Sequence, residues 1–153
     1  MLTVGTAAPD VILHFHDGST TRLSVFRGVY NVVLYFYPRD FTWGCTRQAC
    51  SFADHYNRIT ALGAVLIGVS ADSPEQHRRF VDGYDLPFRL ATDRDSSVSK
   101  AYEVHVLGGL RQLRVTYVID KKGWIRGVIH REIRVLRHAT DVLKILQSLG
   151  QQP

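Results

Sequence analysis

Two runs of apolar residues dominate the pattern of hydrophobic and polar positions along the chain. Residues 31–37 (NVVLYFY) and 64–70 (AVLIGVS) contain few polar side chains, which is typical of strands buried on both faces of a sheet. Pro38 ends the first run, because proline cannot continue a central strand. Residues 43–62 between the two runs are compatible with a helix, so the pattern predicts a βαβ unit with the usual right-handed crossover.

Turn residues predict two hairpins. Asp17 and Gly18 lie between extended runs within residues 11–23, and an Asp-Gly pair in that setting is a strong hairpin signal. The tetrapeptide DKKG at 120–123 separates two strand-like runs within residues 115–129. The chain is therefore expected to carry an N-terminal hairpin and a second antiparallel hairpin close to its C-terminal third.

Helix signals occupy most of the remaining chain. Ser73 suits an N-cap and Pro74 suits the first helical position, which predicts a helix ending near Gly83. A short strand at 88–91 and a short helix at 96–102 follow. The C-terminal segment repeats apolar residues at a spacing of three to four, as an amphipathic helix does: Val135, Ala139, Val142, Leu146 and Leu149.

These elements predict an α/β fold, in which a central mixed sheet is flanked by helices on both faces and preceded by an N-terminal hairpin. The chain has 153 residues, which is the usual size of one domain and too small for two well-formed cores. Because no internal repeat or linker interrupts the pattern, we expect a single domain over residues 1–153.

Composition narrows the class of protein. Apolar residues make up 45% of the chain and charged residues 22%, which is ordinary for a folded soluble protein and argues against disorder. The longest strongly apolar stretch, residues 29–37, falls short of the roughly 20 residues of a spanning helix. The N-terminal residues show no secretory signal pattern, so we expect a cytoplasmic protein in a reducing compartment and no membrane partner.

Charge is spread unevenly. The net charge is +5, but residues 111–138 alone carry +6 and the remainder carries −1. Such a segment can attract nucleic acid or acidic partners. No nucleic-acid motif accompanies it, so we interpret it as a solvated basic face and expect no nucleic-acid partner.

The two cysteines carry the candidate chemistry. They are too few for a disulfide scaffold, and in a reducing compartment cysteine pairs more often serve catalysis or metal binding. Thr42 is a candidate N-cap, which places Cys45 at the third helical position, just after a buried strand. Free backbone amides and the helix dipole favour a thiolate there. We expect the Thr42 hydroxyl to accept a backbone hydrogen bond, and Gly44 to let a ligand approach the backbone.

Cys50 lies five residues after Cys45. On an ideal helix this spacing separates the two Cα atoms by about 8.7 Å, whereas a disulfide requires roughly 4.4–6.8 Å. The two cysteines therefore cannot bond within an intact helix. If they do form a disulfide, the turn between them must unwind, which predicts a helical reduced state and a locally unfolded oxidised state.

The pattern Pro38-x-x-x-Thr42-x-x-Cys45 resembles the active-site motif of the peroxiredoxins, and a second cysteine five positions later is similar to their bacterioferritin comigratory protein, or Q-type, branch. The order of elements agrees over almost the whole chain, including the strand beginning at Arg114. The resemblance implies a thioredoxin-like fold and an atypical two-cysteine peroxidase that reduces hydrogen peroxide and organic hydroperoxides. It implies no metal and no other cofactor, recycling by thioredoxin or a similar dithiol, and a monomer, with a dimer as the alternative.

The same resemblance assigns roles to individual residues. Cys45 corresponds to the peroxidatic cysteine, which becomes a sulfenic acid, and Cys50 to the resolving cysteine, which condenses with it to a disulfide. The remaining positions correspond to substrate-binding groups around the sulfur: Pro38, Thr42, Gly44, Gln48 and Arg114. Arg114 would favour the thiolate and hold the peroxide oxygens, and Gln48 would orient it.

One position departs from the family pattern. Trp43 stands where this branch commonly has proline, and tryptophan does not preset the first helical turn as proline does. We expect Trp43 and Phe41 to pack in the pocket or the core.

Other interpretations remain open from the residues alone. Arg111 rivals Arg114 as the cationic group, Gln48 is equally well a solvated helix residue, and a capping role alone would account for Thr42. A zinc site would need a second pair of ligands, and the seven histidines fit ordinary surface positions. The competing functions are a general thiol–disulfide oxidoreductase, which C-x₄-C in place of C-x-x-C disfavours, and a non-enzymatic redox-sensing or chaperone-like module that binds through residues 111–138.

Overall fold

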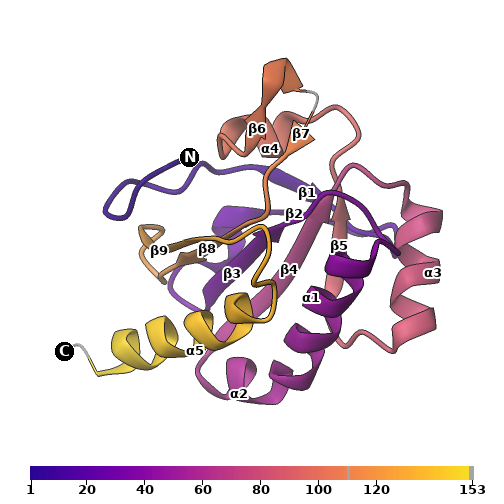
Figure 1. Ribbon diagram of the computed structural model, residues 1–153. Helices are drawn as coiled ribbons and strands as arrows, with labels where there is room; N and C mark the ends of the chain where they lie inside the picture. Colours follow the sequence, from indigo (N-terminus) through magenta and orange to yellow (C-terminus); the bar gives the residue numbers. More distant parts are fainter. Residues whose placement is uncertain (110, 152–153) are drawn as a thin grey trace.

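The computed structural model describes residues 1–109 and 111–151. A five-stranded sheet with the order β5-β4-β3-β8-β9 forms its centre (Figure 1). β3, β4 and β5 are parallel, and β8 and β9 are antiparallel to their neighbours, so the predicted mixed sheet is confirmed. The strands are β3 (Asn31–Phe36), β4 (Ala64–Ser70), β5 (Arg89–Thr92), β8 (Val115–Ile119) and β9 (Ile125–His130).

Helices cover one face of this sheet. They are α1 (Trp43–Asp54), α2 (Tyr56–Ala61), α3 (Pro74–Tyr84) and α5 (Arg137–Gly150). Their apolar sides pack with alternate residues of the central strands in one buried cluster that includes Tyr35, Phe52, Phe80 and Val142. The cysteine-bearing helix α1 therefore rests on the middle of the sheet, beside α5.

The opposite face is covered mainly by the N-terminal segment and the short helix α4 (Ser97–Ala101). The predicted N-terminal hairpin is present as β1 (Ile12–His14) and β2 (Thr20–Arg22), followed by the 3-10 helix η1 (Leu23–Phe26). Leu13 and Phe15 point into this second cluster and are almost fully buried. Because both faces of β3 and β4 are covered, every residue of β3 is buried, as the uninterrupted apolar run indicated.

Several boundaries differ from the sequence prediction. The helix expected over 43–62 is broken at His55 into α1 and α2. Helix α3 ends at Tyr84, close to Gly83 as predicted, and Asp85 after it adopts a left-handed conformation with φ 49°. Aspartate tolerates this conformation better than most residues, so the C-terminus needs no glycine. The small hairpin of β6 (His105–Val106) and β7 (Arg111–Gln112), which flanks the 3-10 helix η2 (Leu107–Gly109), was not predicted.

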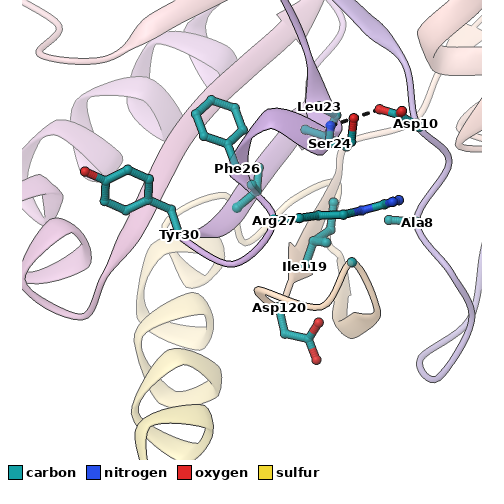
Figure 2. Close-up of a pocket in the computed structure, with 11 residues that line it drawn as sticks. Ala8, Asp10, Leu23, Ser24, Phe26, Arg27, Tyr30, Ile119 and Asp120 are labelled. Carbon is teal, nitrogen blue, oxygen red and sulfur yellow. Dashed lines mark hydrogen bonds between the residues drawn. The ribbon is translucent and has the colours of Figure 1, made fainter.

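A small pocket lies between η1 and the end of β8. Figure 2 shows Arg27 extending across it, with the amide of Ser24 donating to the carboxylate of Asp10 at 2.9 Å. Its volume of about 10 Å³ leaves room for roughly one water molecule, so it does not accommodate a substrate. In the described part of the chain, no helix is both long and apolar enough to cross a membrane.

A buried histidine joins α5 to the sheet. The two ring nitrogens of His138 lie 2.8 Å from Thr116 Oγ1 and 3.0 Å from the carbonyl oxygen of Arg131. His138 and His77 are completely buried, so the expectation that all histidines lie on the surface is wrong for these two. Burial, together with the charges of Arg114 and Arg131, lowers the pKa of His138 to about 4, although the hydrogen bond to the Arg131 carbonyl opposes the shift.

This low pKa predicts a loss of stability in mild acid. Because unfolded histidine titrates near 6.5, the unfolded chain takes up a proton that folded His138 refuses. The His138 contribution is complete above pH 6.5, declines as the pH falls toward 4, and amounts to about 3 kcal/mol of unfolding free energy. Urea unfolding between pH 7 and pH 4 measures it. The slope should shrink in His138→Gln and persist in His14→Gln, a control at an exposed histidine; equal slopes in all three proteins would contradict the assignment.

Candidate active site

Cys45 lies in the first turn of α1, just after the loop that follows β3. The loop 37–42 leaves the carboxyl end of the central strand, and Cys45 follows Trp43 and Gly44 as the third residue of the helix. Its side chain is 1% exposed. The first turn of α1 therefore directs unpaired backbone amides and the positive end of the helix dipole toward this sulfur, which favours its anionic form.

Arg114, directly before β8, completes the surroundings of the sulfur on the face of the sheet that α1 covers. Its Nη1 atom lies 3.3 Å from Cys45 Sγ and 2.6 Å from Gln48 Oε1. All three side chains are at least nine-tenths buried. A guanidinium held against a sulfur in a dry environment stabilises the thiolate far more than the same pair in water. Gln48 is buried rather than solvated, one turn after Cys45 on the same face of α1.

Glu132 holds the backbone of this arginine. The amide of Arg114 donates to Glu132 Oε1 at 2.9 Å, and His130 Nε2 lies 3.1 Å from the same oxygen. Burial raises the pKa of Glu132, but the Arg114 amide, His130 and the charge of Arg111 outweigh it, so the carboxyl stays ionised with a pKa below its ordinary value. Arg111, the rival cation, is exposed and pairs with Glu132 at 3.6 Å. The structure thus brings Arg114, and not Arg111, to the cysteine.

Gly44 is required for this approach. A Cβ atom at position 44 would lie 3.3 Å from Arg114 Nη2 and 3.9 Å from Val135 Cγ1. The first of these is tighter than ordinary contact, so a side chain at position 44 would push the guanidinium. The group that approaches the backbone at Gly44 is therefore the arginine itself.

Thr42 makes a different hydrogen bond from the one expected. Thr42 precedes the helix as its N-cap residue, but its hydroxyl makes no capping bond and instead donates to the carbonyl of Arg39 at 2.9 Å. The expectation that it accepts from a backbone amide is therefore wrong. With its proton committed, Thr42 Oγ1 keeps two lone pairs for an incoming O–H group. Pro38 directly follows the buried Tyr37 and is exposed at the start of the loop.

A buried polar network anchors the loop that carries Pro38 and Thr42. The hydroxyl of Tyr37 donates to Asp40 at 2.6 Å, and the other carboxylate oxygen of Asp40 lies 2.6 Å from His77 Nδ1 on α3. The Asp40 amide donates to Asp72 at 2.9 Å, at the end of β4. Burial raises the pKa of Tyr37 well above its ordinary value, so its hydroxyl keeps the proton that it donates. The loop is thereby fixed to two elements of the fold.

The same network contains the candidate metal ligands of the described residues. Ligand atoms of Asp40, Asp72 and His77 lie within 4.8 Å of one another. Each of these side chains already serves as partner in the hydrogen bonds given above, and His77 Nε2 also lies 3.1 Å from the carbonyl oxygen of Ala91. The arrangement fits the positioning of a loop rather than the coordination of an ion.

The aromatic residues of the loop lie outside the core. Trp43 is 74% exposed and Phe41 44% exposed, so the expectation that Trp43 packs in the pocket or the core is wrong. Phe41 has a φ of 65°, a left-handed conformation that costs roughly 1–2 kcal/mol for a residue with a Cβ atom. Its ring packs edge-on against Phe80 of α3. Ring contacts with α3 therefore hold a strained residue four positions before Cys45.

Cys50 lies on α1, half-buried and unbonded. Both cysteines belong to one intact helix, which agrees with the helical geometry that forbids a disulfide between them in this state. Burial raises the pKa of the Cys50 thiol, and the carboxylate of Asp54 raises it further. Cys50 is thus a neutral thiol near pH 7, whereas the sulfur of Cys45 has a guanidinium nitrogen 3.3 Å away. The two sulfurs are suited to different steps.

Sequence reasoning missed the residues that support this site. Glu132, His77 and Asp40 carry no motif of their own, and each has a partner 18 to 40 positions away in the chain. Gln112 is a further supporting residue without a sequence signal. Its side-chain amide donates to the carbonyl of Tyr37 at 2.8 Å and so links β7 to the end of β3. The one available signal was the position of Asp40 within the motif segment, directly between Pro38 and Thr42.

Comparison with known proteins agrees with this geometry. The model of the AhpC/TSA family matches residues 4–128. The chain is 42% identical over 146 residues to a chloroplastic peroxiredoxin Q of Populus jackii, covering 95% of this chain and 68% of that protein. It is 36% identical over 162 residues to peroxiredoxin Bcp of Bacillus subtilis, covering 99% of each.

Solved structures give the same result. The crystal structure of peroxidoxin BcpB from Mycobacterium tuberculosis superposes with a TM-score of 0.90 at 30% identity, over 97% of this chain and 99% of that one. A peroxiredoxin Q structure from Xanthomonas campestris gives 0.87 at 28% identity, over 99% and 98%. The predicted thioredoxin-like fold is therefore confirmed.

Proposed function

Since the chain belongs to the AhpC/TSA family and is a peroxiredoxin of the Q/Bcp type, its activity is thiol-dependent peroxide reduction, and we propose that Cys45 carries it. The observation that supports this assignment is the contact of 3.3 Å between Arg114 Nη1 and the buried sulfur of Cys45. A thiolate is the reactive form of cysteine. The guanidinium of Arg114 lies directly against the Cys45 sulfur, where it can stabilise a thiolate.

The first step is a displacement at oxygen. The Cys45 thiolate attacks the terminal peroxide oxygen, an S–O bond forms, and the O–O bond breaks with its electron pair on the departing oxygen. That oxygen takes up a proton and leaves as water or an alcohol, and Cys45 becomes a sulfenic acid. Arg114 is placed to stabilise the charge that develops on the departing oxygen, and Thr42 Oγ1 can accept a hydrogen bond from the peroxide O–H.

The second step joins the two cysteines. The Cys50 sulfur attacks the Cys45 sulfenic sulfur, the S–O bond breaks, and water leaves as the disulfide forms. Because both residues lie in the intact helix α1, the turn between them must unwind first. The neutral state of the Cys50 thiol near pH 7 makes loss of its proton part of this step.

The third step restores the thiols. We assign thioredoxin or a similar dithiol as the reductant, because thiol–disulfide exchange through a mixed disulfide returns both cysteines. Hydrogen peroxide and organic hydroperoxides are the proposed substrates. The work on the Xanthomonas campestris bacterioferritin comigratory protein concerned alkyl peroxide reduction, which supports the organic class.

We further propose that residues 1–153 act as one domain and as a monomer in the cytoplasm. Both apolar clusters pack on the same central sheet, and Arg114 reaches Cys45 within one chain. No group from a second copy is needed for the three steps above. The two cysteines, which must both be free thiols at the start of the cycle, suit a reducing compartment.

Mass spectrometry after one equivalent of hydrogen peroxide tests this proposal. We expect the intact chain to lose two hydrogens, and peptide mapping to place the link between Cys45 and Cys50. In Cys50→Ser the same treatment should add one oxygen to Cys45, because the sulfenic acid has no thiol to meet. An unmodified Cys45 in both proteins would refute the assignment.

A further inference from the structure

A broad groove of the described surface lies beside the proposed active site. It runs between Trp43 and Arg47 of α1 and residues 133–144, which form the loop after β9 and the first turns of α5, and its volume is about 480 Å³. We call it the α1–α5 groove. Figure 1 shows the start of α5 beside α1, with this loop between them. Val135 belongs both to the groove and to the surroundings of Gly44, so the groove borders the redox site.

The groove combines exposed apolar side chains with unpaired cations. Ile133 is 88% exposed and Trp43 74% exposed, which is unusual for residues of this size at one place on a small domain. Its four cations are exposed and form no ion pair with any described residue: Arg47, Arg134, Arg137 and Lys144. The Arg47 guanidinium lies over the Trp43 ring, 4.8 Å from its centroid.

Cys50 lies on the same side of α1 as this groove. Trp43, Arg47 and Cys50 are spaced four and three residues apart, which places them in one row along the helix. Cys50 is the more accessible of the two sulfurs, since Cys45 is buried and Cys50 is half-buried. The turn that must unwind for the disulfide lies within residues 45–50, so residues 133–144 of the groove lie outside it, and a protein that reaches Cys50 from this side meets them first.

We propose that the α1–α5 groove is the docking surface for the protein reductant, and that this reductant is an acidic dithiol protein with an apolar patch around its reactive cysteine. The inference rests on the proposed function, because it assumes a disulfide that a partner must reduce. Four unpaired cations on an apolar floor complement acidic side chains around an apolar centre. A second copy of this chain is disfavoured as the occupant, since it would bring like charges together.

The redox step that the groove serves is balanced. The partner thiolate attacks Cys50 Sγ and forms a mixed disulfide, while the Cys45–Cys50 bond breaks and its electron pair stays on Cys45. The partner's second thiol gives up its proton and attacks the mixed disulfide at the partner's own sulfur, and Cys50 leaves and takes up a proton. The protein disulfide gains two electrons, and the partner dithiol becomes a disulfide. Arg114 favours Cys45 as the leaving group, because it stabilises that thiolate.

Charge reversal in the groove tests the proposal. The double variant Arg134→Glu/Arg137→Glu should lower kcat/KM for an acidic thioredoxin at least tenfold at low ionic strength, because rim charges steer association. Turnover with dithiothreitol in its place should stay within twofold. The matched control is Lys121→Glu/Lys122→Glu, which makes the same charge change at the exposed turn between β8 and β9 and should behave as the unmodified protein does with both reductants.

The rate with thioredoxin should also fall with salt in the unmodified protein, and less so in the groove variant. An equal loss with dithiothreitol, an equal loss in the control, or an unchanged thioredoxin rate would overturn the proposal. A loss of rate restricted to carboxylate-bearing hydroperoxides would also overturn it, because the groove would then be a substrate subsite. Salt-sensitive oligonucleotide binding that only the groove variant loses would overturn it as well. Failure of the unmodified protein to consume peroxide with dithiothreitol would instead contradict the proposed function itself.

Discussion

Cys45→Ser is expected to abolish peroxide consumption with every reductant, to at least a thousandfold below the unmodified protein. The reason is chemical: a serine hydroxyl near neutral pH is not ionised and is a poor nucleophile without an activating base. Its neighbours Arg114 and Gln48 offer a cation and an amide, neither of which removes a proton. Peroxide loss followed over time in the presence of dithiothreitol measures the effect.

Cys50→Ser is the matched control for this variant. It removes the other sulfur from the same helix and should still consume about one equivalent of peroxide in the first turnover, because Cys45 remains. Its continued turnover then depends on whether a small thiol can reach the Cys45 sulfenic acid. In the structure, with both cysteines as free thiols, Cys45 is only 1% exposed. A first-turnover burst in Cys45→Ser, or none in Cys50→Ser, would reverse the assignment of the two roles.

Arg114→Met should lower the rate of Cys45 oxidation by a factor of roughly 10² to 10³. Loss of one preorganised charged donor at a reacting oxyanion typically costs this much, and here the same group also stabilises the attacking thiolate. The methionine keeps the volume and the apolar stem but removes the donor that lies 3.3 Å from the sulfur. Stopped-flow measurement of the single-turnover oxidation isolates this step from recycling.

Arg111→Met tests whether the position or only the charge matters. Arg111 lies three residues earlier, is exposed, and reaches the site only through Glu132, so its loss should slow oxidation no more than about threefold. Thermal melts of both variants separate a chemical effect from unfolding. Equal rates in the two variants would show that the guanidinium at the sulfur is not what accelerates the reaction.

The residues with a local signal were predictable from sequence. Residues 64–70 form β4 over the whole predicted range, because an uninterrupted apolar run has few alternatives in a chain of this size. Ser73 caps α3 through its side chain, with Pro74 at the first helical position, because these residue types satisfy or dispense with an unpaired amide. The placement of Cys45 in the first turn of α1 followed from the same kind of local reasoning.

Features that depend on distant partners were not predictable. The hydroxyl of Thr42 was expected to cap the helix, yet the turn at 39–42 offers it the carbonyl of Arg39. Trp43 was expected to pack inside, yet its place on the outer row of α1 leaves it exposed. His77 and His138 looked like surface residues, because nothing in their own segments indicates that Asp40 or Thr116 meets them in the interior.

By itself, the sequence determined the α/β order of elements, the position of Cys45 at a helix start, and the impossibility of a Cys45–Cys50 bond within an intact helix. These conclusions depend on hydrophobic period, capping and helical rise, which act over a few residues. Only the tertiary structure decided which arginine meets the sulfur, what holds that arginine, and that an apolar, cationic groove opens beside it. Those arrangements join side chains from strands, loops and helices far apart in the chain, and packing of the sheet against α1 and α5 is what brings them together.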